Sequence, residues 1–273
     1  MVKDSLGDRM KKYYEEIPKT KLMRRTPVII RIDGKAFHSF TRGFEKPFDK
    51  ILIKTMQETT KYLCENIQGC VLGYTQSDEI SLVLIDYQKL ETSAWFDYEI
   101  QKMCSIAASM ATMAFNKFFK LNYSLDKRTK ENISAYIRAL TNGAMFDARC
   151  FNIPREEVTN YIYWRQLDAT RNSIQSCGQA NFSHNELQNK TCNDIQDMLM
   201  TQKGINWNDF EAYLKRGTAV FKNGIIVNRN NKMEEIMLFN PEYSSREWII
   251  DYEMPQLKGE NREYVERLIK IWQ

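Results

Sequence analysis

The sequence has few of the residues that build several common catalytic sites. Among its 273 residues there are two histidines, His38 and His184, which supply little for an imidazole-rich metal site or a Ser-His-Asp triad. The six cysteines are scattered without a CxxC pair, which argues against a zinc ribbon or a disulfide framework and fits free thiols in a reducing cytoplasm. The absence of a Walker loop and of a GxGxxG motif disfavours a P-loop or dinucleotide-binding fold.

Long apolar runs are missing as well. The longest uncharged, apolar-rich stretch, residues 106–115, is far too short to cross a bilayer, and the charged N-terminus MVKDSLGDRMKKYYEE shows no export signal. We therefore expect a cytoplasmic protein without a membrane segment. With 43% hydrophobic residues, the chain can bury one large core or two modest ones.

The chain does contain two basic stretches. Its net charge is only +4, but residues 1–31 hold nine Lys or Arg against four acidic residues, and residues 117–138 hold six against two. Such stretches suit a polyanion partner, although a solvated surface would carry the same charges.

The order of the periodic segments predicts an α+β fold. Four segments are typical of strands and two of amphipathic helices: residues 28–33, 69–76, 80–86 and 145–153, and residues 49–67 and 93–119. The order β-α-β-β-α-β predicts a split βαβ, ferredoxin-like antiparallel sheet with helices, in which the first and third strands are neighbours.

The pattern changes beyond residue 154. Residues 155–203 are typical of helices, Asn223-Gly224 predicts a β-hairpin over 217–229, and residues 259–271 predict an amphipathic helix. We therefore divide the chain near residue 154 into a first domain, 1–154, and a mainly helical C-terminal region with a hairpin, 155–273.

Acidic residues from two distant segments should meet at one edge of this sheet. Asp33 ends the first strand, and Asp78 and Glu79 lie at the tip of the hairpin formed by the middle two. Carboxylates without histidine or thiolate companions suit Mg²⁺, and two such ions about 3.5 to 4 Å apart support nucleotidyl transfer. Gly34 would let a phosphate or metal approach closely and could add its carbonyl as a ligand. Each acidic motif alone could instead simply cap a turn.

Groups that could hold a nucleotide lie near the same edge. Lys35 and Lys46 follow the first strand, and Lys102 lies in the long helix, although each could be an ordinary surface lysine. Phe37 and His38 could stack on or border a base, but an aromatic residue after a buried strand is also typical of a core.

Several motifs together resemble the tRNA-His guanylyltransferase superfamily. They are RIDGKAFHSF at 31–40, EKPFD at 45–49, YTQSDEISLVL at 74–84, FDAR at 146–149, YIYWRQLDATRN at 161–172 and KRGT at 215–218. The resemblance covers most of residues 1–222. It implies that residues 1–154 form a polymerase palm-like catalytic domain that extends RNA in the 3′-to-5′ direction and that residues 155–273 contribute to RNA binding. It also implies a homo-oligomer, in this family a tetramer.

The resemblance also implies roles for individual residues. They are two-Mg²⁺ binding by Asp33, Gly34 and Asp78 with Glu79 close by as a catalytic group, contacts to nucleotide phosphates by Lys46, Ser77 and Lys102, and tRNA handling by Arg149 and Asn172. The implied substrates are tRNA with ATP and GTP or other NTPs.

One departure from the family pattern points to a branch. Eukaryotic members that add guanylate to tRNA-His carry a segment like HINNLYN after the WRQ motif, where this chain has TRNSIQS at 170–176, with Thr170 in place of the histidine. The chain is therefore similar to the bacterial and archaeal tRNA-His guanylyltransferase-like proteins. This similarity implies template-dependent repair of truncated tRNA 5′ ends, after activation of the 5′-phosphate with ATP.

Other functions use the same residues. Guanylate addition to tRNA-His is one alternative, and a palm-type nucleotidyl cyclase or a forward polymerase would use the same strand-end carboxylates. A non-enzymatic RNA-binding module would need none of them. The sequence gives no role to Lys190 or Lys215.

Overall fold

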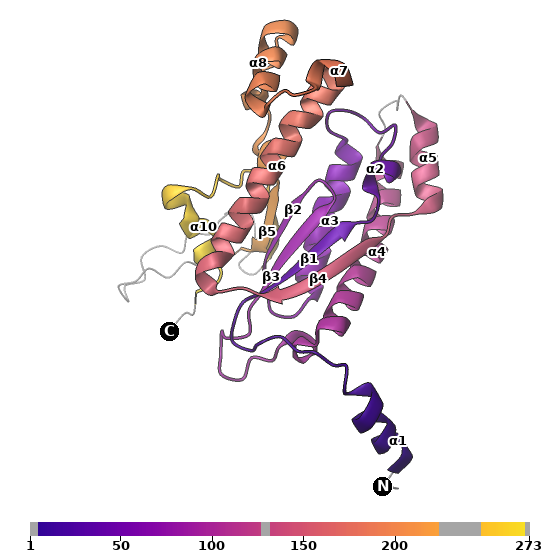
Figure 1. Ribbon diagram of the computed structural model, residues 1–273, viewed down its shortest axis with the longest axis vertical. Helices are drawn as coiled ribbons and strands as arrows, with labels where there is room; N and C mark the ends of the chain where they lie inside the picture. Colours follow the sequence, from indigo (N-terminus) through magenta and orange to yellow (C-terminus); the bar gives the residue numbers. More distant parts are fainter. Residues whose placement is uncertain (1–4, 127–131, 224–246, 271–273) are drawn as a thin grey trace.

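A single antiparallel sheet organises the chain. The computed structural model describes residues 5–126, 132–223 and 247–270. Six strands pair in the order β4-β1-β3-β2-β5-β6 (Figure 1). Their bounds are Val28–Gly34 for β1, Cys70–Gln76 for β2, Glu79–Leu84 for β3, Phe146–Asn152 for β4, Thr218–Lys222 for β5 and Trp248–Asp251 for β6.

The predicted order of the first four strands and their two long helices is confirmed. Helix α3 (Lys50–Asn66) follows β1, helix α4 (Ile100–Leu125) follows β3, and the order β4-β1-β3-β2 is that of the split βαβ pattern. Two short helices, α2 (Phe37–Phe40) and α5 (Ile133–Asn142), precede α3 and β4.

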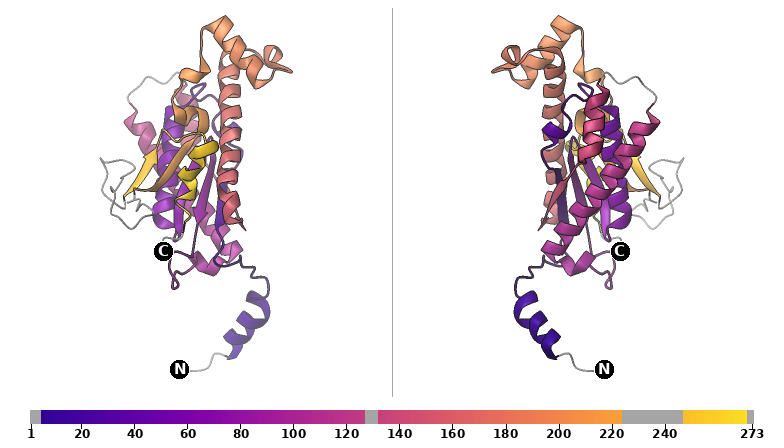
Figure 2. Two further views of the ribbon diagram at one scale, coloured as in Figure 1. Left: turned by 90° about the vertical axis from the view of Figure 1, so that its left-hand side faces the viewer. Right: turned by 90° about the vertical axis from the view of Figure 1, so that its right-hand side faces the viewer.

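The sheet separates two apolar cores because successive side chains of a strand point to opposite faces. Ile30 and Ile32 of β1 pack with α3 and α4, whereas Ile29 packs with α6 (Val158–Asn181) and the C-terminal segment. Figure 2 shows α6 running along one face of the sheet. The same alternation places Arg31 and Asp33 on the α6 face, beneath that helix.

The predicted start of the long helix is wrong. Residues 93–99 precede α4, and Trp95–Tyr98 form a 3₁₀ turn in which Phe96, Asp97 and Tyr98 have φ of 48°, 51° and 56°. Tyr98 is nonetheless buried, and its carbonyl accepts a 3.0 Å hydrogen bond from the Leu22 N–H. Tertiary contacts therefore impose a left-handed turn where the apolar periodicity predicts helix.

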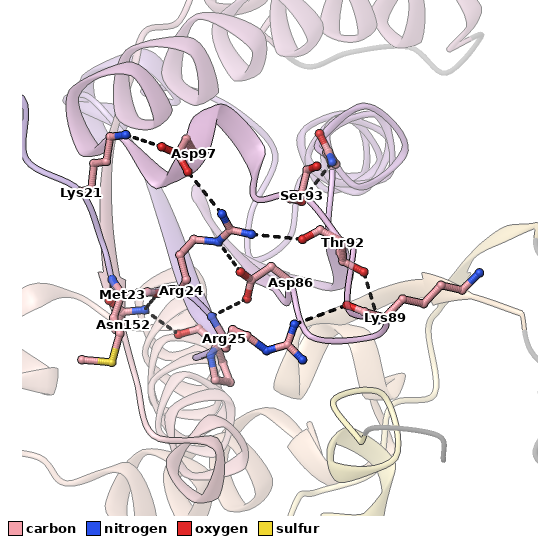
Figure 3. Close-up of polar contacts among 12 residues, drawn as sticks. Lys21, Met23, Arg24, Arg25, Asp86, Lys89, Thr92, Ser93, Asp97 and Asn152 are labelled. Carbon is pink, nitrogen blue, oxygen red and sulfur yellow. Dashed lines mark hydrogen bonds and ion pairs between the residues drawn. The ribbon is translucent and has the colours of Figure 1, made fainter.

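This turn belongs to a polar network that attaches the segment before β1 to the loop after β3 (Figure 3). Arg24 Nε donates to Asp86 at 2.6 Å, and its terminal nitrogens reach Asp97 and the Thr92 carbonyl. The Arg25 N–H donates to the other oxygen of Asp86 at 2.8 Å. Asp86 is 1% exposed, so it anchors both arginines from inside the protein.

The C-terminal region is only partly as predicted. The helical region is confirmed as α6, α7 (His184–Leu187) and α8 (Cys192–Lys203), and α9 (Ala212–Arg216) follows. Strand β5 occupies the first half of the predicted hairpin, whose turn at Gly224 and second strand lie outside the described residues. Within the described chain β5 pairs with β2 and with β6, a strand that the sequence analysis missed.

The remaining elements are short. A turn at Gly259–Arg262 and helix α10 (Glu263–Glu266) replace the longer terminal helix predicted over 259–271. Helix α1 (Ser5–Met10) and a π-helical turn (Lys11–Glu15) bury no residue and project away from the sheet (Figure 1). The boundary near residue 154 stays a prediction. Among the described helices, none combines the length and the hydropathy that a bilayer crossing needs.

Candidate active site

The carboxylates of the predicted site meet at the end of β1. Asp33 lies opposite Glu79 in the β1–β3 register, and the Gly34 N–H donates to the Asp78 carbonyl at 3.1 Å. Ser77 and Asp78 form the two-residue turn between β2 and β3, with Ser77 at φ 50°. The strand pattern therefore brings Asp33 and Asp78 together, as the sequence analysis expected.

Asp33 and Asp78 influence each other electrostatically. Partial burial raises the pKa of Asp78, and the negative charge of Asp33 raises it further, while a 3.0 Å hydrogen bond from Ser77 Oγ lowers it. Both side chains are half-buried. A divalent cation between them would remove this repulsion, and with the Gly34 carbonyl they provide the oxygen ligands that Mg²⁺ prefers.

Glu79 points to a different set of partners. Arg31 Nη2 donates to Glu79 Oε2 at 2.7 Å, and Arg165 Nε lies 3.0 Å from Glu79 Oε1 without hydrogen-bond geometry. Burial raises the pKa of Glu79, against the lowering by Arg165 and Arg31. No cluster of three or more His, Cys, Asp or Glu suited to a metal occurs in the described part of the chain. The geometry thus leaves two carboxylates for metal binding, and the catalytic role of Glu79 stays a prediction.

A pocket of about 600 Å³ is lined by Asp78 and by Gly34, the residue after Asp33, whereas Asp33 itself is not among the lining residues. Its lining includes seven residues from the predicted site, namely Gly34, Phe37, His38, Lys46, Ser77, Asp78 and Asn172. It also includes polar residues that the sequence analysis did not select, among them Thr41, Glu45, Asp49, Gln57, Ser173 and Tyr213. Asp49 could have been found from its place in the EKPFD motif, whereas Gln57, which donates to Thr218 at 2.9 Å, carries no local signal.

The glycine after Asp33 is required by packing. A Cβ at Gly34 would lie 2.2 Å from Cδ2 of Phe37. The Phe37 ring is 5% exposed and packs against Phe40, Phe115 and Phe146, so the core reading of this aromatic residue is correct even though it also borders the pocket. His38 is exposed at the pocket, with Nε2 3.0 Å from Ser39 Oγ.

Besides Asp33 and Glu79, three predicted residues do not line this pocket. Lys35 lines a second cavity. Lys102 is in the first turn of α4, with its ammonium 4.8 Å from the Phe96 ring centroid, whereas the pocket lies near Phe115, about 20 Å further along the helix axis. Arg149 pairs in register with Arg31 and lies 3.2 Å from Asp147 at the β4 edge. Their nucleotide and tRNA roles stay predictions.

Lys215 and the cysteines have identifiable surroundings. Lys215 donates to the Asn208 carbonyl and lies 5.7 Å from the Trp207 ring centroid. All six cysteines are free, with Cys104 Sγ and Cys150 Sγ 3.2 Å apart.

A palm-like antiparallel sheet with paired carboxylates at a strand end, beside a nucleotide-sized pocket, is the arrangement of a nucleotidyltransferase. The model of the tRNAHis guanylyltransferase family matches residues 7–154, and the chain belongs to that family. The resemblance found in the sequence is therefore confirmed, and the protein is a nucleotidyltransferase of the 3′-to-5′ nucleotide-adding kind.

Solved structures and curated relatives agree with this assignment. A bacterial tRNA(His) guanylyltransferase (Thg1)-like protein in complex with ATP is 42% identical with a TM-score of 0.78, covering 98% of this chain and 100% of that one. The same kind of bacterial protein in complex with GTP is 38% identical with a TM-score of 0.74 over the same shares. The tRNA(His) guanylyltransferase of Saccharomyces cerevisiae is 27% identical over 221 residues, which is 74% of this chain and 85% of that enzyme.

Proposed function

We propose that this protein repairs truncated tRNA by adding nucleotides to the 5′ end in the 3′-to-5′ direction, with the opposite strand of the acceptor stem as template. The observation that carries the proposal is the meeting of Asp33 and Asp78 at one strand end, where Asp78 and Gly34 line a pocket of about 600 Å³. Relatives in complex with ATP and with GTP support nucleoside triphosphates as substrates. The segment at 170–176, with Thr170, favours repair over strict guanylate addition to tRNA-His.

Asp33, Asp78 and the Gly34 carbonyl would hold two Mg²⁺ ions. When bound, such a pair lowers the pKa of an attacking hydroxyl and stabilises a departing phosphate. Burial, and to a smaller extent the charge of Asp33, raises the pKa of Asp78, and a bound cation would offset both effects.

The reaction would have two chemical stages at one site. A 5′-monophosphorylated RNA end first attacks the α-phosphate of ATP and releases pyrophosphate, which leaves an adenylylated end. The 3′-hydroxyl of the incoming NTP then attacks that 5′-phosphate and displaces AMP. An end that already carries a triphosphate needs only the second stage, which displaces pyrophosphate.

Residues that line the pocket would hold the phosphates of the nucleotide in place and neutralise their negative charge. Lys46 and Ser77 border the pocket beside Asp78 and can meet phosphate oxygens with a charge and a hydroxyl. Asn172 of α6 borders it from the opposite face of the sheet and adds an amide. Because the template strand selects the nucleotide, the protein can recognise the RNA by its shape and charge.

The deciding experiment supplies a tRNA lacking its first nucleotide, NTPs and Mg²⁺. We expect growth at the 5′ end by the nucleotide that pairs with the template, for several different tRNAs. Growth at the 3′ end, or formation of a cyclic nucleotide from NTP alone, would reject the proposal in favour of a forward polymerase or a cyclase. Guanylate addition restricted to tRNA-His would replace repair by the classical family activity.

By family likeness we also propose a homo-oligomer, with the tetramer as the expected form. Multi-angle light scattering of the full chain measures this directly, and a monomer at the assay concentration would contradict it.

A further inference from the structure

A second cavity adjoins the first at the start of α2, where the two share a lining residue. It encloses about 370 Å³ and is lined by Lys35, Ala36, Ser39, Phe40, Arg42, Arg138, Ala139, Asn142 and Gly143. Ala36 lines both cavities, so the start of α2 forms a common wall between them. The second cavity therefore adjoins the nucleotide pocket without being part of it.

Its charge is of one sign. Three cations from three different segments line it: Lys35 from the loop after β1, Arg42 from the loop after α2, and Arg138 from α5. Among the lining residues that the structure describes there is no Asp or Glu. Within residues 5–126, 132–223 and 247–270, neither Lys35 nor Arg42 forms an ion pair, and the partners of Arg138 are the carbonyl oxygens of Arg42 and Phe40.

Part of this cavity is held in place by the fold. The hydrogen bonds from Arg138 attach α5 to the end of α2, and the Lys35 N–H donates to the Met145 carbonyl at 2.9 Å, just before β4. Three like charges that converge without a counter-charge repel one another, and an anion in the cavity relieves that repulsion. Two guanidinium groups and an ammonium are the donor set that recognises phosphate.

We propose that this second cavity is a phosphate-binding site, and that its phosphate comes from the backbone of the RNA strand whose 5′ end lies at Asp33 and Asp78. Lys35 is two residues beyond Asp33, so their Cα atoms are at most about 7 Å apart. A strand that ends at the carboxylates thus has its following phosphates within reach of the cavity. The proposal rests on the proposed 5′-end addition; the alternative source of the same phosphate chemistry is the triphosphate of a second NTP.

The test removes two charged side chains, Lys35 and Arg42, that form neither an ion pair nor a side-chain hydrogen bond with the described residues. The variant Lys35→Ala/Arg42→Ala is compared with Lys190→Ala/Lys258→Ala, which removes two exposed lysines outside both cavities. All four side chains are exposed, so both variants should melt at the wild-type temperature. Dissociation constants for 5′-truncated tRNA are measured by filter binding across a salt series, and KM for NTP is measured at saturating RNA.

For the cavity variant we expect about tenfold weaker RNA binding and a salt dependence whose log-log slope is smaller by about 2, with an unchanged KM for NTP. The control variant should keep RNA binding within about twofold of wild type. If instead KM for NTP rises while RNA binding is unchanged, the cavity binds the triphosphate of an NTP. The assignment of the cavity to the RNA backbone is then wrong.

The site itself is overturned if the two variants behave alike in both measurements. This failure is distinct from a failure of the proposed function, which wild-type protein reveals by leaving the truncated tRNA unextended in the same preparation. RNA binding is measured without catalysis, so it tests the phosphate-binding role of the second cavity whether or not the protein extends truncated tRNA.

Discussion

Glu79 and Arg165 form a buried ion pair, with Nε 3.0 Å from Oε1 and both side chains at most 5% exposed. Arg31 holds the other oxygen of Glu79, and Asp168 holds the other end of Arg165. Glu79, the residue after Asp78, therefore directs its carboxylate to two arginines beneath α6. Adjacent acidic residues at one turn thus have different chemical surroundings.

This pair leads to a prediction about stability. Glu79→Ala should lower the free energy of unfolding by about 3 kcal/mol, because it removes the buried carboxylate that faces both Arg31 and Arg165 and leaves Asp168 alone to balance Arg165. Glu79→Gln keeps the volume and an acceptor oxygen and should lose clearly less. Urea denaturation monitored by circular dichroism measures both. Equal stability of Glu79→Ala and wild type would show that the Glu79–Arg165 ion pair does not stabilise the fold.

The same variants test the predicted catalytic role of Glu79. If the residue acts only by holding Arg31 and Arg165, Glu79→Gln should retain substantial 5′-end addition at a temperature where it is fully folded. Loss of activity in folded Glu79→Gln, with unchanged RNA binding, would place the carboxylate in the chemistry itself.

A second prediction concerns the two carboxylates left for metal. Asp33→Asn and Asp78→Asn should each reduce nucleotide addition by about three orders of magnitude or more and weaken Mn²⁺ binding, while RNA affinity changes little. Asp147→Asn is the matched control, since Asp147 lies opposite Asp33 in the β1–β4 register but is 61% exposed and paired with Arg149. Mn²⁺ bound per chain is counted by electron paramagnetic resonance.

If both variants still bind Mn²⁺ as wild type does, the metal site does not lie at this strand end. Chelation of divalent ions should likewise abolish addition by wild-type protein and leave its RNA affinity nearly unchanged. Addition that persists in excess chelator would contradict the two-metal mechanism.

Gly34 allows a separate test of packing. Gly34→Ala places a methyl group 2.2 Å from the Phe37 ring and should lower the free energy of unfolding by about 1 to 3 kcal/mol. In Gly34→Ala/Phe37→Leu the smaller side chain makes room, so the double variant should be more stable than the sum of the single losses predicts. Additive losses would show that the glycine is needed for another reason, such as close approach of a ligand to the backbone.

The sequence predicted those parts of the site that depend on local patterns. Asp33 and Asp78 could be placed together because a buried strand and a tight hairpin each determine where their last residue lies, and antiparallel pairing then determines their distance. The partners of Glu79 could not be predicted, because Arg165 reaches it from α6, 86 positions further along the chain. The second cavity could not be predicted from the sequence for the same reason, because α5 brings Arg138 to Lys35 and Arg42 only in the folded protein.

The missed features of the fold have a similar cause. Apolar spacing from Ser93 to Phe119 is continuous, but burial of Tyr98 and the contacts of Asp97 with Lys21 and Arg24 favour a left-handed turn over a longer helix. Strand β6 is short and, within the described residues, pairs with β5, so its formation depends on partner residues that lie 26 to 32 positions earlier in the sequence.

Figure 3 shows two carboxylates beside Arg24, those of Asp86 and Asp97. They differ in burial and in their other partners, and this difference leads to the last prediction. Asp86→Ala should lower the free energy of unfolding by about 3 kcal/mol, since Asp86 is buried and its loss leaves the Arg25 N–H and the Arg24 Nε without their acceptor. Asp97→Ala should cost clearly less than Asp86→Ala, because Asp97 is 57% exposed and solvent screens its pairs with Lys21 and Arg24.

Hydrogen exchange at the Arg25 amide separates local from global effects in these two variants. In Asp86→Ala this amide should exchange much faster than in wild type, because its acceptor is gone, whereas in Asp97→Ala it should stay protected. Equal stability losses in the two variants, or protection of the Arg25 amide without Asp86, would show that the segment before β1 is held mainly by its apolar contacts and by the hydrogen bond from the Leu22 N–H to the Tyr98 carbonyl.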